Sequence, residues 1–334
     1  MKTIERLRYT GNSFQLGGVR PYELTDGWAR KIRAFDVNTG GGFEYTVLPD
    51  RGMDISMARY KGVNLVYLTC NSETAPSYYE PCGNGWLHTF SGGLLTTCGL
   101  THLGPPSVDE GETLGLHGRY STIPAKQVSD RSMWIDGEYH IKLSGTTEEG
   151  SIFGNKLRLV REISSVVGKN ELEITDKITN FGYQPSPYTI LYHINLGYPL
   201  LSEDAELIVE PEDTIPRDEN ARTGMNEFRK FIKPEDTYNE QVFLHRMKAG
   251  ENGIAEATLL NRKLGVRLTV KFNTDQLPYL TEWKMMGAGE YVLGLEPCNV
   301  PVKSRKQLRE ERSLPFLDPQ ASVLNKVTIS IEEV

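Results

Sequence analysis

Apolar and polar side chains alternate along much of the chain, and this period of two predicts β-strands. Phe43, Tyr45 and Val47 follow a run of three glycines and alternate with polar neighbours, as one arm of a hairpin does. The same alternation defines two further hairpins and a last strand. The predicted segments are residues 31–50, 157–163 with 172–178, 255–260 with 266–272, and 322–334.

Helical patterns are few and short, and the best candidates are residues 226–232 and 305–312. The 32 Gly and 18 Pro suit a chain with many turns. Numerous short strands between turns predict an all-β fold, a large antiparallel β-sandwich or a barrel. No low-complexity linker divides the chain, so residues 1–334 are predicted to form one domain, although length alone would suggest two.

The composition narrows the class of protein. Hydrophobic residues make up 38% and charged residues 24% of the chain, the mix of a soluble globular protein. No apolar run is long enough to span a membrane, and the first residues lack the apolar core of a secretory signal. The four cysteines have no CxxC spacing, so free thiols and a cytoplasmic location are expected. The net charge of −7 argues against a nucleic-acid partner.

His193 lies on a predicted strand whose two faces differ in character. Successive side chains of a strand point to opposite faces. Tyr192 and Ile194 therefore share a face that can be buried, whereas His193 and Asn195 share the other face with Leu191. Two polar groups side by side on an otherwise apolar strand are compatible with a ligand site, although this strand alone does not favour one. A buried histidine bonded to a backbone carbonyl is the alternative.

Glu296 is placed by the same parity. Leu293 and Leu295 take one face of their strand, while Gly294 and Glu296 take the other. A carboxylate at the end of an apolar strand is partly desolvated, which should raise its pKa towards a range useful for proton transfer. Pro297 is expected to end the strand pairing and so to place Glu296 at a strand mouth. The alternative is a rim carboxylate paired with an arginine.

His117 and Arg51 are two further candidates, each beside a glycine. On a strand, Gly115, His117 and Arg119 would share a face, and the glycine would let a ligand approach the backbone. A simple turn is the alternative. Arg51, next to Gly52, could hold ligand hydroxyls or pair with a neighbouring aspartate. The GxSxG, GxxxxGK[ST] and HExxH motifs are absent, so the chemistries that they carry are not indicated.

In chain order, these residues resemble those of galactose mutarotase and its relatives. Residues 116–118 (Leu-His-Gly) are similar to that family's substrate-positioning His-Gly, and residues 193–196 (His-Ile-Asn-Leu) resemble its catalytic His with the trailing Asn-Leu. Residues 295–297 (Leu-Glu-Pro) resemble its catalytic Glu segment, and Arg51 resembles the arginine that holds the sugar. The resemblance covers most of the chain and implies a large β-sandwich of mostly antiparallel strands.

The resemblance also implies an isomerase of the aldose 1-epimerase type, which interconverts the anomers of a monosaccharide and needs neither metal nor cofactor. Glu296 would be the base and His193 the acid, while His117 and Arg51 would orient the sugar. Aromatic faces on which a sugar ring could stack are those of Trp86, Trp283, Tyr192 and Tyr291. The further residues expected to contact the substrate are Arg119, Asn195, His88 and Trp283.

Two other functions stay open at this stage. One is a carbohydrate-binding protein without catalysis. The other is a different isomerisation, epimerisation or elimination on a keto-sugar or uronate, with His88, His117, His193 and Glu296 as ligand types that suit Zn or Mn. A glycosidase is less favoured, because that reaction usually needs two carboxylates beside the scissile bond.

Overall fold

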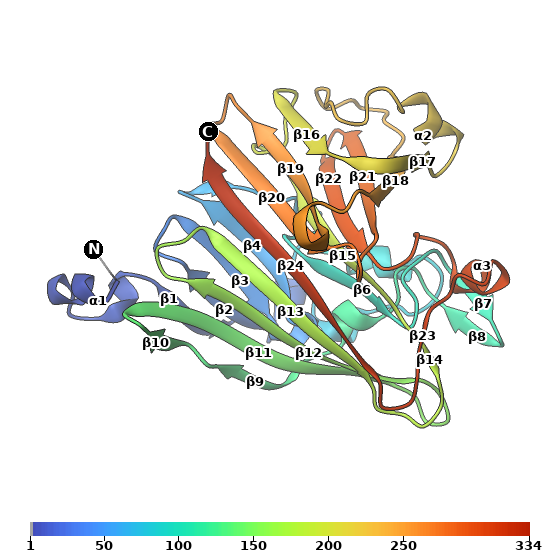
Figure 1. Cartoon of the computed structure of the whole chain (residues 1–334), viewed down its shortest axis with the longest axis horizontal. Coiled ribbons are helices and arrows are strands. Elements are labelled where there is room, and N and C mark those ends of the chain that lie inside the picture. Colours follow the sequence, from blue (N-terminus) through green and yellow to red (C-terminus); the bar gives the residue numbers. More distant parts are fainter. Residues whose placement is uncertain (1–2) are drawn as a thin grey trace.

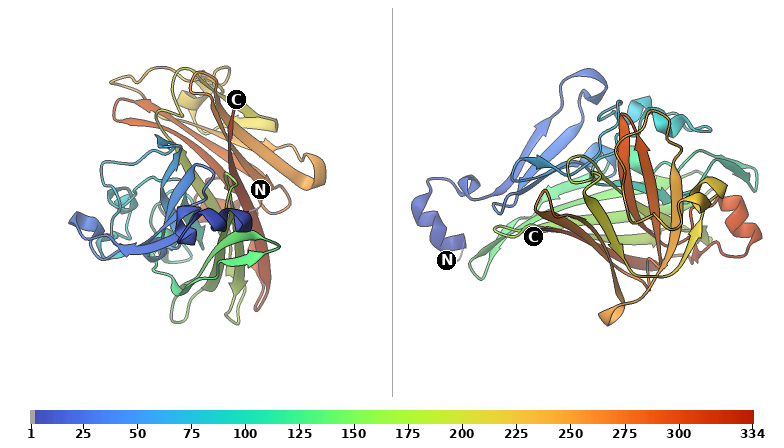
Figure 2. Two further views of the ribbon diagram at one scale, coloured as in Figure 1. Left: turned by 90° about the vertical axis from the view of Figure 1, so that its left-hand side faces the viewer. Right: turned by 90° about the horizontal axis from the view of Figure 1, so that it is seen from above.

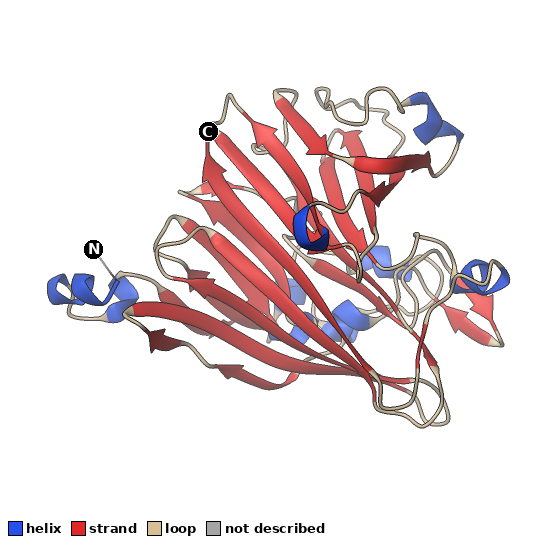
Figure 3. Ribbon diagram, viewed as in Figure 1, coloured by secondary structure: helices blue, strands red, loops and turns tan. Residues whose placement is uncertain are grey.

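The computed structural model describes residues 3–334 and consists mainly of antiparallel strands, with three short α-helices at its margins (Figures 1 and 3). The helices are α1 (Thr3–Arg6), α2 (Glu219–Thr223) and α3 (Arg305–Glu310). α3 begins where the sequence predicts a helix, and its N-cap Ser304 accepts a hydrogen bond from the backbone N–H of Gln307. None of the described helices is long and apolar enough to cross a membrane.

The fold is built from three large β-sheets. The five-stranded sheet has the order β1 (Gly18–Glu23), β2 (Arg33–Asn38), β3 (Phe43–Leu48), β4 (Asp54–Tyr60) and β5 (Val63–Asn64). The nine-stranded sheet has the order β10 (Met133–Ile135), β11 (Glu138–Gly150), β12 (Lys156–Val166), β13 (Glu171–Asn180), β24 (Ser322–Glu333), β20 (Val266–Asn273), β19 (Ile254–Asn261) and β16 (Ala205–Val209), with β9 (Lys126–Asp130) also paired to β11.

The third sheet is six-stranded and carries the site described below. Its order is β17 (Pro211–Pro216), β18 (Gln241–Met247), β21 (Tyr279–Gly287), β22 (Glu290–Cys298), β15 (Thr189–Leu196) and β6 (Thr96–Leu100). Two small pairs complete the structure, β7 (Ser107–Asp109) with β8 (Glu112–Leu114) and β14 (Ser186–Pro187) with β23 (Phe316–Leu317).

One large apolar core joins the three sheets. The long strands of the nine-stranded sheet form one layer, and the smaller sheets pack against it (Figure 2). Ile174 of β13, Val47 of β3 and Ile194 of β15 are all fully buried in this core. Burial of apolar side chains from both layers is what holds such a sandwich together.

The predicted hairpins are confirmed as β2–β3, β12–β13 and β19–β20, and the predicted last strand is β24. The helix predicted at residues 226–232 is wrong, because that segment forms turns after α2 has ended near Gly224. Its Phe228 and Phe231 are buried in the main core, so their spacing reflects packing rather than a helical face. The four cysteines are free thiols, as expected.

Candidate active site

A cavity of about 370 Å³ lies over one face of the six-stranded sheet. The opposite face of the same strands is packed in the main core by residues such as Ile194 and Leu295. Loops from the rest of the chain close the cavity around the strands. The lining residues are Asn84, Trp86, Leu87, Phe90, Pro105, Leu116, His117, His193, Arg217, Glu240, Val242, Thr281, Trp283, Glu296 and Val302.

His193 and Glu296 meet because their strands are antiparallel neighbours. Ile194 of β15 pairs with Leu295 of β22, and this register puts His193 opposite Glu296 on the cavity face. The Nε2 of His193 lies 3.2 Å from Oε1 of Glu296, and the two side chains are only 5% and 3% exposed. The alternation of side chains along each strand therefore predicted correctly that both residues lie on the face away from the main core.

Gly294 leaves the room that the Glu296 carboxylate occupies. A Cβ at position 294 would lie 2.4 Å from Oε1 of Glu296 and 3.0 Å from Cβ of Trp283. The absence of a side chain at position 294 thus makes room for the Glu296 carboxylate and the Trp283 side chain. The prediction that Pro297 ends the strand pairing is wrong. Pro297 still pairs with Leu280 of β21.

Burial shifts the proton affinities of this pair in opposite directions. Desolvation, and then the charge of Glu240, hold the pKa of Glu296 well above its usual range. Desolvation, and then His117, hold the pKa of His193 well below its usual value. Each shift favours the neutral form of its group, which is a protonated carboxyl group on Glu296 and an uncharged imidazole on His193.

Two buried polar atoms of the pair have no hydrogen-bond partner within residues 3–334. They are Nδ1 of His193 and Oε1 of Glu296, whose contact with His193 is close but not aligned as a hydrogen bond. Buried polar groups are nearly always satisfied, so such atoms at the wall of a cavity point to a polar ligand or water. The arrangement can bind a group that both donates and accepts hydrogen bonds.

His117 reaches the cavity from a turn, which is one of the two alternatives that the sequence left open, and not from a strand. Its φ is 58°, and its Nδ1 lies 2.8 Å from the carbonyl oxygen of Leu103. That carbonyl can only accept, so Nδ1 carries the hydrogen and Nε2 is left as an acceptor. The ring is 5.8 Å from that of His193, centroid to centroid, and 4.6 Å from that of Trp86.

Aromatic rings form much of the remaining wall. Trp86 stacks on Phe90 with centroids 4.3 Å apart, and Trp283 lies 5.4 Å from His193 at 79°. The indole N–H of Trp283 donates to Glu240 at 2.7 Å, and Arg217 donates to the same carboxylate at 2.7 Å. Trp86 and Trp283 are thus the two aromatic candidates that line the cavity. Tyr192 and Tyr291 instead bond to Asp176 and to the carbonyl of Ile232.

Four residues expected to contact the substrate do not line the cavity. Arg51 is buried elsewhere and donates to the carbonyls of Thr74 and Thr89 at 2.6 and 3.0 Å, with its pKa lowered to about 10 by burial. The Asn195 side chain donates to the backbone carbonyls of Gly93 and His193. His88 is exposed and lies 3.0 Å from Glu80, and Arg119 is exposed as well.

Phe90, Arg217 and Glu240 were missed by the sequence reasoning. Phe90 is close to Trp86 in the chain and could have been included with it. Arg217 and Glu240 lie in connections beside β17 and β18, and no local pattern marks them. Within residues 3–334, no group of three or more His, Cys, Asp or Glu side chains is arranged to hold a metal ion.

Several solved structures with a similar fold are of proteins named as sugar epimerases or mutarotase-like proteins. A candidate aldose 1-epimerase from Klebsiella pneumoniae has a TM-score of 0.88 at 25% identity, over 94% of this chain and 83% of that chain. A galactose mutarotase-like protein from Clostridium acetobutylicum has a TM-score of 0.65 at 13% identity, over 96% and 100%. The galactose 1-epimerase of Lactobacillus acidophilus has 0.62 at 15%, over 95% and 99%.

The chain therefore has the galactose mutarotase-like β-sandwich fold that the resemblance implied. Its residues 29–331 match the family described as a domain of unknown function, DUF4432, and the chain belongs to that family. No match was found among curated proteins.

Proposed function

We propose that this protein is an aldose 1-epimerase-like isomerase that interconverts the anomers of a monosaccharide. The observation that carries the proposal is the cross-strand pair of His193 and Glu296 at the wall of an aromatic cavity. A volume of about 370 Å³ suits a small-molecule site. Similar folds in proteins named for aldose epimerisation support the same class of reaction.

Anomer exchange needs one proton removed from the anomeric hydroxyl and one given to the ring oxygen. The bond between C1 and the ring oxygen then breaks, the C1 carbonyl rotates, and the ring closes on its other face. Both oxygens are bonded to the same carbon, so an acid and a base that touch each other can serve both. The pair ends with its proton moved from one member to the other, and ring closure restores it.

Glu296 acts as the base and His193 as the acid in this proposal. Burial by itself favours the neutral pair, in which the proton is on Glu296. Hydrogen bonds from sugar hydroxyls stabilise a carboxylate, and the carboxylate stabilises an imidazolium beside it. A bound sugar therefore shifts the pair to the charged form that the reaction requires.

The other cavity residues hold the ring. Nε2 of His117 is an acceptor for a sugar hydroxyl, and the rings of Trp86 and Trp283 offer apolar faces to the ring carbons. Arg51 supports the site indirectly, because it ties together the backbone at Thr74 and Thr89, next to Phe90. The cytoplasmic location expected from the sequence stays a prediction.

NMR exchange spectroscopy over a panel of aldoses and ketoses tests the proposal. The expected result is faster α/β exchange for at least one sugar in the presence of catalytic amounts of protein. Saturable binding without faster exchange would instead favour a carbohydrate-binding protein. Activity on a keto-sugar or uronate that is lost on chelation would favour the metal-assisted alternative.

A further inference from the structure

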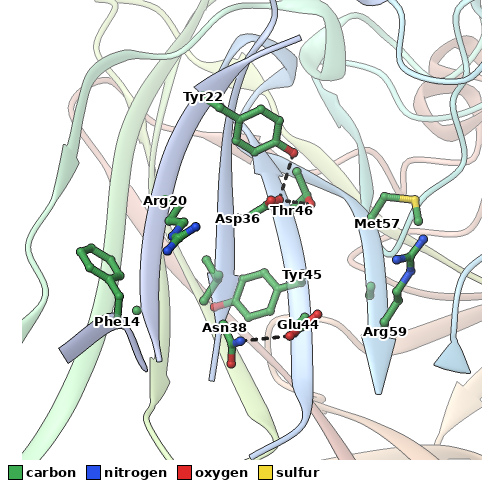
Figure 4. Close-up of a pocket in the computed structure, with 13 residues that line it drawn as sticks. Phe14, Arg20, Tyr22, Asp36, Asn38, Glu44, Tyr45, Thr46, Met57 and Arg59 are labelled. Carbon is green, nitrogen blue, oxygen red and sulfur yellow. Dashed lines mark hydrogen bonds between the residues drawn. The ribbon is translucent and has the colours of Figure 1, made fainter. Parts of the chain in front are cut away.

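A second hollow, of about 440 Å³, lies on the outer face of the five-stranded sheet (Figure 4). Val19, Val37, Tyr45 and Ala58 point from these strands into the main core, so their chain neighbours point outwards. The hollow shares no lining residue with the His193–Glu296 cavity. We call it the N-terminal groove.

The strand register arranges the outward side chains in two rows across the sheet. One row joins Arg20 of β1, Asp36 of β2 and Thr46 of β3. The other joins Gly18, Asn38, Glu44 and Arg59, from β1 to β4. Residues that are neighbours in a row lie close enough for their side chains to share one ligand.

The hollow exists because short side chains form its floor and long ones form its walls. Thr46 and Asn38 are short, and Gly18 has no side chain. The ring of Phe14 lies over Gly18, where a Cβ would be 3.0 Å from its Cδ1. Phe14 and Tyr22 form the wall on the β1 side, and Met57 and Arg59 form the wall on the β4 side (Figure 4).

Neutral donors hold the two carboxylates of the floor in place. Oδ1 of Asp36 accepts hydrogen bonds from Tyr22 at 2.9 Å and from Thr46 at 2.6 Å. Oε1 of Glu44 accepts one from Asn38 at 3.0 Å. The second oxygen of each carboxylate receives no hydrogen bond within residues 3–334. Both therefore remain as fixed acceptors facing the groove.

The two guanidinium groups beside these carboxylates are also free to bind. Arg20 is opposite Asp36 and Arg59 is opposite Glu44 in the register, yet in the described chain neither guanidinium group forms a hydrogen bond or salt bridge. The Arg20 guanidinium carbon lies 5.8 Å from the centroid of the Phe14 ring. A guanidinium offers five N–H donors, so the groove presents donors directly beside acceptors.

This pattern of charges selects the kind of ligand. The formal charges of Arg20, Arg59, Asp36 and Glu44 cancel, and an anion would meet a carboxylate next to each arginine. A hydroxyl group can donate to a carboxylate and accept from a guanidinium at the same time. Phe14 and Tyr22 are 48% and 39% exposed and offer ring surface to the apolar side of a sugar.

We propose that the N-terminal groove binds a short neutral oligosaccharide. The distance from β1 to β4 is three strand spacings, roughly 14 Å, which is longer than one sugar ring. The occupant is therefore a chain of two or three units rather than the monosaccharide assigned to the cavity. The proposal does not depend on catalysis by His193 and Glu296, because the two hollows share no lining residue.

Calorimetric titration with maltotriose, cellotriose and xylotriose tests the proposal. At least one of these probes is expected to bind saturably to the wild-type protein, with one site per chain. Asp36→Asn keeps an oxygen for Tyr22 and Thr46 but replaces the free acceptor with a donor. Asp36→Asn and Arg59→Ala should each raise the Kd at least about tenfold, because each removes a charged partner of ligand hydroxyls.

Two controls separate the groove from the cavity. Glu296→Gln should leave the affinity for the trisaccharide unchanged, and so should Arg246→Ala, which removes an exposed arginine outside the groove. The proposal is overturned if none of the probes binds, or if Asp36→Asn and Arg59→Ala bind as the wild type does. Tighter binding of trigalacturonate than of every neutral probe would also overturn it.

Discussion

The His193–Glu296 cavity and the N-terminal groove are similar in volume, about 370 and 440 Å³, and both combine polar groups with aromatic rings. They differ in how far water reaches the polar groups. His193 and Glu296 are 5% and 3% exposed, whereas Asp36, Glu44 and both arginines of the groove are exposed. The same kinds of side chain therefore work in two different environments.

Burial is what shifts the pKa values of the two cavity groups. Removing water penalises charge, so the pKa of Glu296 rises and that of His193 falls. In the proposed reaction these two groups exchange protons with the sugar. The exposed groups of the groove can hold hydroxyls, but they have no water-free partner with which to transfer a proton. In the two proposals above, proton transfer therefore belongs to the cavity, and the groove only binds.

The largest expected effect comes from removing the proton-transfer pair. Glu296→Gln and His193→Asn should each lower kcat for anomer exchange at least about 10²-fold, because a positioned acid or base contributes that much. NMR exchange spectroscopy measures the rate. Thermal unfolding and trisaccharide binding in the groove should be unchanged. Wild-type turnover in both variants would contradict the proposed roles of Glu296 and His193 in proton transfer.

A smaller loss is expected from Gly294→Ala. The added Cβ would lie 2.4 Å from Oε1 of Glu296, so the carboxylate must move away from its place opposite His193. A displacement of about 1 Å in a catalytic group can cost on the order of 10²-fold, so kcat should fall between about 10- and 100-fold. Gly11→Ala is the matched control, because nothing lies within 4 Å of its added Cβ. Equal rates in both variants would show that the carboxylate does not need this space.

Arg51→Ala tests whether this buried arginine supports the cavity through the backbone. Its loss leaves the carbonyls of Thr74 and Thr89 without their donor, which should lower the free energy of unfolding by about 1–3 kcal/mol. Denaturant titration measures this change. Groove affinity should be unchanged in the folded variant. An unaltered free energy of unfolding would show that the hydrogen bonds from Arg51 to these two carbonyls do not stabilise the fold.

The smallest effect concerns the pH dependence of the reaction. The negative charge of Glu240 helps to raise the pKa of Glu296, so Glu240→Gln should lower that pKa. Since Glu296 must be deprotonated to act as the base, the acidic limb of kcat/KM should move to lower pH. The glutamine oxygen can still accept from Trp283. Glu212→Gln, at an exposed carboxylate outside the cavity, should leave the profile in place, and a limb that moves upward would contradict the proposed role.

Strand periodicity was sufficient to predict which face of its own strand His193 and Glu296 each occupy. His193 and Glu296 fall opposite the apolar positions of their own strands, and β15 and β22 bury those apolar faces in the main core. Local sequence also predicted the three hairpins and the last strand, since the period of two and the turn residues are properties of short segments. The helix at 226–232 failed because buried phenylalanines in turns can imitate a helical spacing.

The tertiary structure decided everything that depends on which segments become neighbours. It paired β15 with β22 in the register that brings His193 to Glu296, placed His117 on a turn, and buried Arg51 away from the cavity. It also brought Glu240 to Trp283 and aligned four strands into the N-terminal groove. Side-chain parity is local to one strand, whereas register and loop packing depend on contacts between residues far apart in the chain.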